Sequence, residues 1–270
     1  MPKLTAIAPK RLSHFVVNLG AADFADAEAV RRLTFSPAIR IRREPEGVRI
    51  DLSNGEAGSD SCAYIARSAS WRDYEALSRI VGERRMSLAF HQGVLELRMP
   101  GHVHEKILHL LIALIDAICA ELRIPQLDTG SLTLKRPDLE CGAEPDCAFY
   151  FGEVARALNA KSDERLDMSL DPAPHLAIEV DIASDSLDRP PIYAALGIAE
   201  VWRWSRGAVE FLTLGPDSAY VRVAESRRFP RLTAQQVNRL LDLRQTLDKA
   251  FWQLEVREFI QRELASAIED

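Results

Sequence analysis

The sequence lacks the motifs on which several protein classes depend. Its four cysteines, Cys62, Cys119, Cys141 and Cys147, form no CxxC pair, which argues against a zinc knuckle and favours a reducing, cytoplasmic compartment. The chain contains no GxGxxG or Walker phosphate loop, so we expect no organic cofactor. It also has no nucleophile-elbow motif that would anchor serine-hydrolase chemistry.

Long hydrophobic runs and an excess of positive charge are absent as well. The most apolar segment, residues 107–122, is interrupted by His109, Asp116 and Glu121, so it predicts a buried helix and no membrane span. The N-terminal residues lack the apolar stretch of a signal peptide. The formal net charge of −6 argues against a protein that coats nucleic acid through bulk charge. A local basic groove is compatible with it, and an acidic metal site would itself lower the total.

What remains is the composition of an ordinary globular protein. With 47% hydrophobic and 27% charged residues, a chain of 270 residues can bury a sizeable core. The turn-forming stretch at 53–59 separates an N-terminal extension, 1–60, from an α/β domain, 61–232. A helical tail, 233–270, begins with a predicted capping box at Thr233 and Gln236. We expect this tail to pack either on its own domain or on the partner in a homodimer.

Helices and strands alternate through the α/β domain. Predicted helices cover 73–81, 102–123, 153–160 and 191–196. Predicted strands cover 86–91, 94–99, 131–135, 147–151, 175–183, 200–205, 209–214 and 220–223. From residue 102 the order is helix, strand, strand, strand, helix, strand, which is typical of a mixed sheet flanked by helices.

The strand at 175–183 carries two carboxylates in an otherwise apolar segment. Because side chains alternate along a strand, Glu179 and Asp181 share one face, about 6.5 Å apart by strand rise. Burying both of them unpaired would be expensive, so a metal ion, a basic side chain or water at an open cleft should compensate them. A solvated edge strand is the alternative interpretation. The opposite face is apolar and holds Leu176, Ile178, Val180 and Ile182.

A further acid stands at the start of the strand at 147–151. Pro145-Asp146 alone is most simply a turn, but its place before the strand gives the pattern Asp-x(32)-Glu-x-Asp across neighbouring strands. Carboxylates that converge in this way suit a hard divalent cation such as Mg²⁺. Such ions activate water and stabilise in-line displacement at phosphorus.

Taken together, these residues resemble the PD-(D/E)XK nuclease motif. A second stretch is more specific, because its tyrosine, glycine, glutamate and tryptophan are similar to the signature of the Uma-two family of restriction-endonuclease-like proteins. The resemblance covers about residues 71–232. Its residues are Pro145, Asp146, Glu179, Val180 and Asp181 for the nuclease motif, Tyr193, Gly197, Glu200 and Trp202 for the signature, and His104, Phe229 and Pro230 in support.

The resemblance implies a restriction-endonuclease-like fold and hydrolysis of DNA phosphodiester bonds that depends on Mg²⁺ or Mn²⁺. Asp146 and Glu179 would hold the metal, and Glu105 on the long helix would complete the site. Asp181 stands where the superfamily has its lysine, and Arg189 stands where the Uma-two pattern supplies one. Arginine stays charged, so it can stabilise a transition state but cannot accept a proton from water.

Two functions therefore follow from the sequence. The first is a metal-dependent endonuclease whose activity is weak or degenerate because the motif lysine is missing. The alternative is a non-catalytic member of the fold that acts as a nucleic-acid-binding or oligomeric scaffold. Pro190 and Pro191, which stand where the family continues a helix, are a further departure from the pattern.

Overall fold

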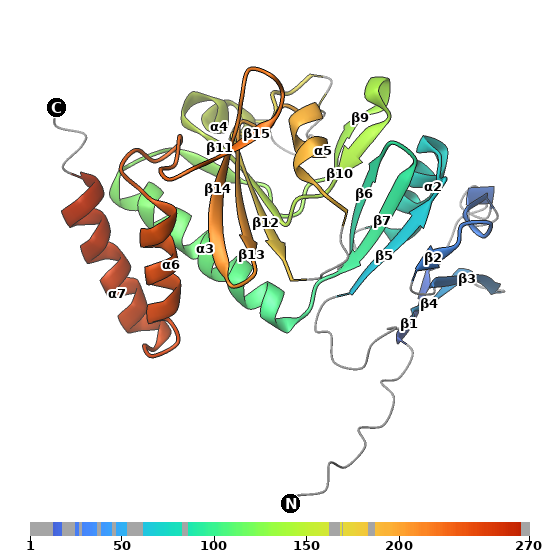
Figure 1. Ribbon diagram of the computed structural model, residues 1–270, viewed down its shortest axis with the longest axis horizontal. Helices are drawn as coiled ribbons and strands as arrows, with labels where there is room; N and C mark the ends of the chain where they lie inside the picture. The colour runs from blue at the N-terminus through green and yellow to red at the C-terminus, as the bar shows by residue number, and fades with distance from the viewer. Residues whose placement is uncertain are drawn as a thin grey trace, which may run out of the picture. The chain divides into compact units, whose positions relative to one another are not determined.

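A computed structural model describes residues 13–17, 25–26, 29–36, 39–44, 47–52, 62–82, 86–161, 168, 170–182 and 187–265. The turn-forming stretch at 53–59 that was predicted as a boundary lies outside these residues. The chain separates into two compact units (Figure 1). One contains Met1–Gly101 with Asp185–Leu187, and the other contains His102–Ser184 with Asp188–Asp270.

The first unit is built on two antiparallel sheets and one helix. One sheet has the order β1 (Ser13–Val17), β4 (Gly47–Leu52), β3 (Ile39–Glu44), and the other has β2 (Phe35–Ser36), β5 (Cys62–Arg67), β7 (Val94–Met99), β6 (Ser87–His91). The hairpin between β6 and β7 turns at Gln92 and Gly93, both with positive φ. Helix α2 (Trp71–Val81) starts at a capping box formed by Ser70 and Asp73 and buries its apolar face in this unit.

The second unit contains a mixed sheet of six strands. Its order is β15 (Tyr220–Val223), β14 (Ala208–Leu214), β13 (Glu200–Ser205), β12 (Leu176–Asp181), β11 (Cys147–Phe151), β8 (Gln126–Asp128). Strands β12 and β13 run parallel, whereas the other neighbouring pairs are antiparallel. The mixed sheet expected from the sequence is therefore confirmed, and β12 occupies an interior position in it.

The segment between α3 and β11 differs from the prediction. In place of one strand at 131–135, the structure has β8 and a separate strand β9 (Leu134–Arg136), which pairs with β10 (Cys141–Ala143). Gly130 lies between β8 and β9 with φ 57°, a left-handed conformation that interrupts extended backbone. A short 3₁₀ turn, Pro137–Leu139, connects β9 to β10.

Helices cover one face of this sheet. Helix α3 (His102–Glu121) and the tail helices α6 (Ala234–Leu243) and α7 (Lys249–Phe259) share an apolar core with Leu176, Ile178 and Val180 of β12. This confirms which face of β12 is apolar. Thr233 and Gln236 form the predicted capping box of α6. Helix α7 ends in a π-helical turn, Ile260–Leu264, and it lies along α3 (Figure 1), where Arg257 pairs with Glu121 at 2.7 Å.

Two short helices complete the second unit. Helix α4 (Gly152–Asn159) follows β11, and α5 (Pro190–Ala195) connects β12 to β13. Because α5 begins directly after Arg189, it fixes that residue and Tyr193 one helical turn apart. None of the helices in the described part of the chain is long and apolar enough to cross a membrane.

Candidate active site

The register of two central strands brings the predicted carboxylates together. Strands β11 and β12 are antiparallel, with Cys147 opposite Ile178. One residue beyond that pair, Asp146 stands opposite Glu179. The backbone N–H of Val180 donates to Asp146 Oδ2 at 2.7 Å, so the carboxyl group that precedes β11 is fastened directly to β12. Asp146 and Glu179, separated by 32 residues in the sequence, therefore lie side by side.

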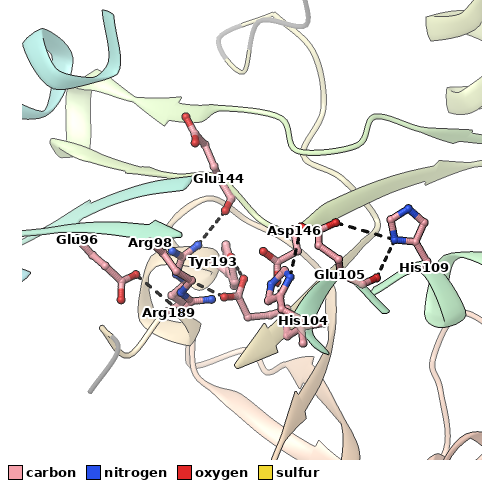
Figure 2. Close-up of polar contacts among 11 residues, drawn as sticks. Glu96, Arg98, His104, Glu105, His109, Glu144, Asp146, Arg189 and Tyr193 are labelled. Atoms are coloured by element: carbon pink, nitrogen blue, oxygen red, sulfur yellow. Dashed lines mark hydrogen bonds and ion pairs between the residues drawn. The ribbon is translucent and has the colours of Figure 1, made fainter. Parts of the chain in front are cut away.

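Asp146 is buried next to a histidine. The Nε2 atom of His104 lies 2.9 Å from Asp146 Oδ2, and the two side chains are 2% and 6% exposed. His104 belongs to the first turn of α3, which points this ring at the start of β11. Its Nδ1 atom lies 3.7 Å from Glu105 Oε1, so both ring nitrogens face carboxylates (Figure 2).

Glu179 has two partners from the α5 region, and all three side chains are buried. The Tyr193 hydroxyl donates to Glu179 Oε2 at 2.5 Å, and Arg189 Nε lies 3.5 Å from Glu179 Oε1. Arg189 also donates from Nη1 to the backbone carbonyl of Glu144 at 2.8 Å (Figure 2). Glu144 precedes Pro145 and Asp146 in the chain. Arg189 therefore ties the segment that carries Asp146 to the strand that carries Glu179.

This arrangement identifies what compensates the buried carboxylate of Glu179. Of the compensating groups predicted from the sequence, a basic side chain is present, because Arg189 is only 1% exposed and faces Glu179. Burial and the neighbouring Glu179 raise the pKa of Tyr193 well above its ordinary value. The phenol therefore stays protonated and donates to Glu179 over the whole working pH range, and it cannot act as a base.

The other two predicted site residues lie at the margin of this cluster. Asp181 ends β12 and is only partly buried, one strand pleat beyond Glu179. Glu105 is 35% exposed, and its Oε2 lies 3.9 Å from His109 Nδ1, on the far side of His104 from Asp146. The structure thus brings Asp146, Glu179 and Arg189 together, with Glu105 linked to them through His104.

The sequence did not predict the contacts of His104 and Tyr193, although both residues carry the family resemblance. Tyr193 could have been found from its spacing, because it follows Arg189 by four residues and therefore shares a helix face with it. No comparable signal exists for His104, whose contact with Asp146 joins residues 42 positions apart. This contact depends on how α3 packs against the start of β11.

The carboxylate pair suits a magnesium ion in its chemistry. Mg²⁺ usually retains several waters and is held in proteins by one or two carboxylates together with substrate phosphate oxygens. Asp146 and Glu179 supply such a pair of hard oxygen donors on adjacent strands. Over the described residues, no group of three or more His, Cys, Asp or Glu side chains is placed to hold a metal ion. Water and phosphate would therefore have to provide the other ligands.

A mixed sheet flanked by helices, with paired carboxylates on two of its neighbouring central strands, defines a restriction-endonuclease-like domain. The comparison with protein families agrees, because the model of one family, described as "Putative restriction endonuclease", matches residues 71–247. The chain belongs to this family, Uma2, which confirms the resemblance drawn from its motifs. No curated protein matches the sequence.

Proposed function

We propose that this protein is a divalent-metal-dependent endonuclease that hydrolyses phosphodiester bonds of DNA. The observation that carries the proposal is the adjacency of two carboxylates, Asp146 at the start of β11 and Glu179 on β12, whose side chains are 6% and 3% exposed. Membership of the family described as "Putative restriction endonuclease" supports the same reaction class. The ion would be Mg²⁺ or Mn²⁺, and Asp146 and Glu179 would hold it. When bound, such an ion activates water and neutralises charge on the phosphate.

The surrounding residues have positioning roles in this proposal. His104 and the Val180 N–H orient Asp146, while Tyr193 and Arg189 orient Glu179. Arg189 is buried and already engaged by Glu179 and the Glu144 carbonyl, so it acts as a counter-ion for Glu179. Its guanidinium remains charged at every working pH, so the proton of the attacking water must leave to another acceptor, such as solvent.

Cleavage of DNA tests the proposal. Supercoiled plasmid and single-stranded DNA are incubated with the protein in Mg²⁺ or Mn²⁺, with EDTA as the metal-free control. We expect cleavage by the wild-type protein in either metal and none by Asp146→Ala or Glu179→Ala. The exposed pair of Glu153 and Arg156 on α4 supplies a matched control, Glu153→Ala, which should cleave normally. Equal cleavage by the wild-type protein and the Asp146 variant would refute the proposed role of this site.

A second function is favoured by one specific observation, the buried ion pair of Arg189 with Glu179. A permanent cation held against a metal-binding carboxylate is also what a non-catalytic, DNA-binding or scaffold member of the fold would retain. The variant Arg189→Lys separates the two functions. Cleavage that appears only in this variant would place the wild-type protein in the non-catalytic class and locate the defect in one side chain.

A further inference from the structure

A row of charged side chains continues across the sheet from Glu179. In the register of the sheet, Glu179 on β12 is opposite Arg203 on β13, and Arg203 is opposite Glu210 on β14. Directly paired residues project from the same face of a sheet. The other face is apolar at this level, where Trp202 stacks on Phe211 in the core. The three charged residues therefore share the face that carries the candidate active site.

Exposure is low at Glu179, intermediate at Arg203 and at Glu210 (20%), and highest at Arg222, which lies on the edge strand β15 opposite Leu212, one pleat away from the row. The side chain of Glu179 is 3% exposed, that of Arg203 is 29% exposed, and that of Arg222 on the edge strand β15 is 71% exposed. The row and the adjoining Arg222 thus lead from the buried site to the exposed edge of the sheet, where β15 is the last strand (Figure 1).

Two arginines, Arg203 in the row and Arg222 beside it, share a single carboxylate. Arg203 Nε lies 3.1 Å from Glu210 Oε1, and Arg222 Nη1 lies 3.6 Å from Glu210 Oε2. One glutamate neutralises only one of the two positive charges, so these three residues carry a net charge of +1. Glu210 also holds both guanidinium groups on the same side of the sheet. This local positive charge contrasts with the formal charge of −6 for the whole chain.

We infer that Arg203 and Arg222 form a binding site for the phosphate backbone of DNA next to the catalytic carboxylates. Both guanidinium groups lie within 3.6 Å of the oxygens of one carboxylate, Glu210, so they are close enough together to contact the same phosphate or adjacent phosphates of one strand. A DNA strand whose scissile phosphate lies at Asp146 and Glu179 would then place flanking phosphates against the arginines. The inference rests on the proposed function for the choice of DNA as ligand.

Replacing an arginine of this site should weaken DNA binding, whereas replacing Glu210 should strengthen it. Each phosphate contact that is lost reduces the slope of log affinity against log salt by about 0.9. Raising the salt from 50 to 200 mM should therefore reduce the DNA affinity of the wild-type protein about 3.5-fold more than it reduces the affinity of Arg222→Gln. Glu210→Gln removes the carboxylate that competes with phosphate, so it should bind DNA more tightly than the wild-type protein.

Fluorescence anisotropy of a labelled duplex oligonucleotide, titrated with protein over this salt range with Ca²⁺ in place of Mg²⁺, measures binding. The variants are Arg203→Gln, Arg222→Gln and Glu210→Gln. Arg222 is the most exposed of the three, so its variant remains informative if Arg203→Gln does not fold. The matched controls are Arg156→Gln and Glu153→Gln, an exposed pair on α4, and both should bind as the wild-type protein does.

Weaker binding with a reduced salt slope for Arg222→Gln, together with tighter binding for Glu210→Gln, supports the inference. Wild-type affinity and slope in Arg222→Gln would overturn it, and so would a wild-type protein that does not bind the duplex. Cleavage measured separately in Mg²⁺ distinguishes the two claims. Binding shifts as expected without any cleavage would leave the arginine site in place and reject the endonuclease. Cleavage by the wild-type protein, together with wild-type DNA binding by Arg222→Gln, would reject the arginine site and leave the endonuclease in place.

Discussion

The hydroxyl of Tyr193 offers the sharpest test of how the candidate site is held together. Replacing Tyr193 with phenylalanine keeps the buried ring and removes only the donor to Glu179 Oε2. Glu179 is 2% exposed, so water cannot readily take the place of the lost donor. A hydrogen bond to a charged group contributes about 1.5–3 kcal/mol, and we expect Tyr193→Phe to lower the free energy of unfolding by about 2 kcal/mol.

Thermal and chemical denaturation measure this loss. For a unit of this size, a loss of about 2 kcal/mol corresponds to a fall of about 4–8 °C in Tm. Tyr150→Phe is the matched control, because the hydroxyl of this equally buried tyrosine donates to a neutral acceptor, the Pro172 carbonyl, at 3.0 Å. Its loss should cost about 1 kcal/mol. If Tyr193→Phe costs no more than Tyr150→Phe, the hydrogen bond to the Glu179 carboxylate does not stabilise the site as argued.

Two further predictions concern buried ionisable groups. Arg189→Met leaves Glu179 buried without its cation, so chemical denaturation should show that the free energy of unfolding falls by about 3–5 kcal/mol. The control is Arg156→Met, at an exposed ion pair, and a smaller loss for Arg189→Met than for this control would contradict the role of the buried ion pair. Burial lowers the pKa of His175, whose Nδ1 accepts the Phe151 N–H at 3.0 Å, so the stability it contributes is present above pH 6.5 and is lost as pH falls through the lowered pKa. The unfolding free energy of His175→Asn should fall less below pH 6.5 than that of the wild-type protein, and an unchanged pH profile would refute this.

Local signals in the sequence predicted much of the second unit. The alternation along β12 identified its apolar face, because Leu176, Ile178 and Val180 do reach the core that contains Trp202. The capping box at Thr233 is equally local, since it depends on residues three positions apart. The pairing of β9 with β10 was not predicted, because β10 has three residues, Cys141–Ala143, and carries no alternating pattern.

Only the part of the site that depends on local strand patterns was predicted. Asp146 precedes one strand and Glu179 lies within the neighbouring strand. The antiparallel register of these two strands places the two carboxylates together. The groups that neutralise them come from α3 and from the segment before α5, and no periodicity in the sequence specifies those tertiary contacts. The homodimer stays a prediction, and light scattering over a range of protein concentrations tests it: a single monomer mass throughout would reject it.

The second unit contains three cysteines. Cys119, Cys141 and Cys147 are all buried and unpaired with one another. Burial raises the pKa of the Cys119 thiol to about 12 and that of Cys141 to about 11. Both thiols therefore stay protonated at neutral pH.

Calorimetric titration with Mn²⁺ tests most directly whether Asp146 and Glu179 form a divalent-metal site. The experiment compares the wild-type protein with Asp146→Asn, which keeps the shape of the side chain, and with Asp138→Asn, which changes an exposed aspartate paired with Arg136. We expect saturable binding by the wild-type protein and by Asp138→Asn, and loss of that binding in Asp146→Asn. Wild-type protein that binds no Mn²⁺, or an Asp146 variant that binds it equally well, would contradict a metal site at Asp146 and Glu179.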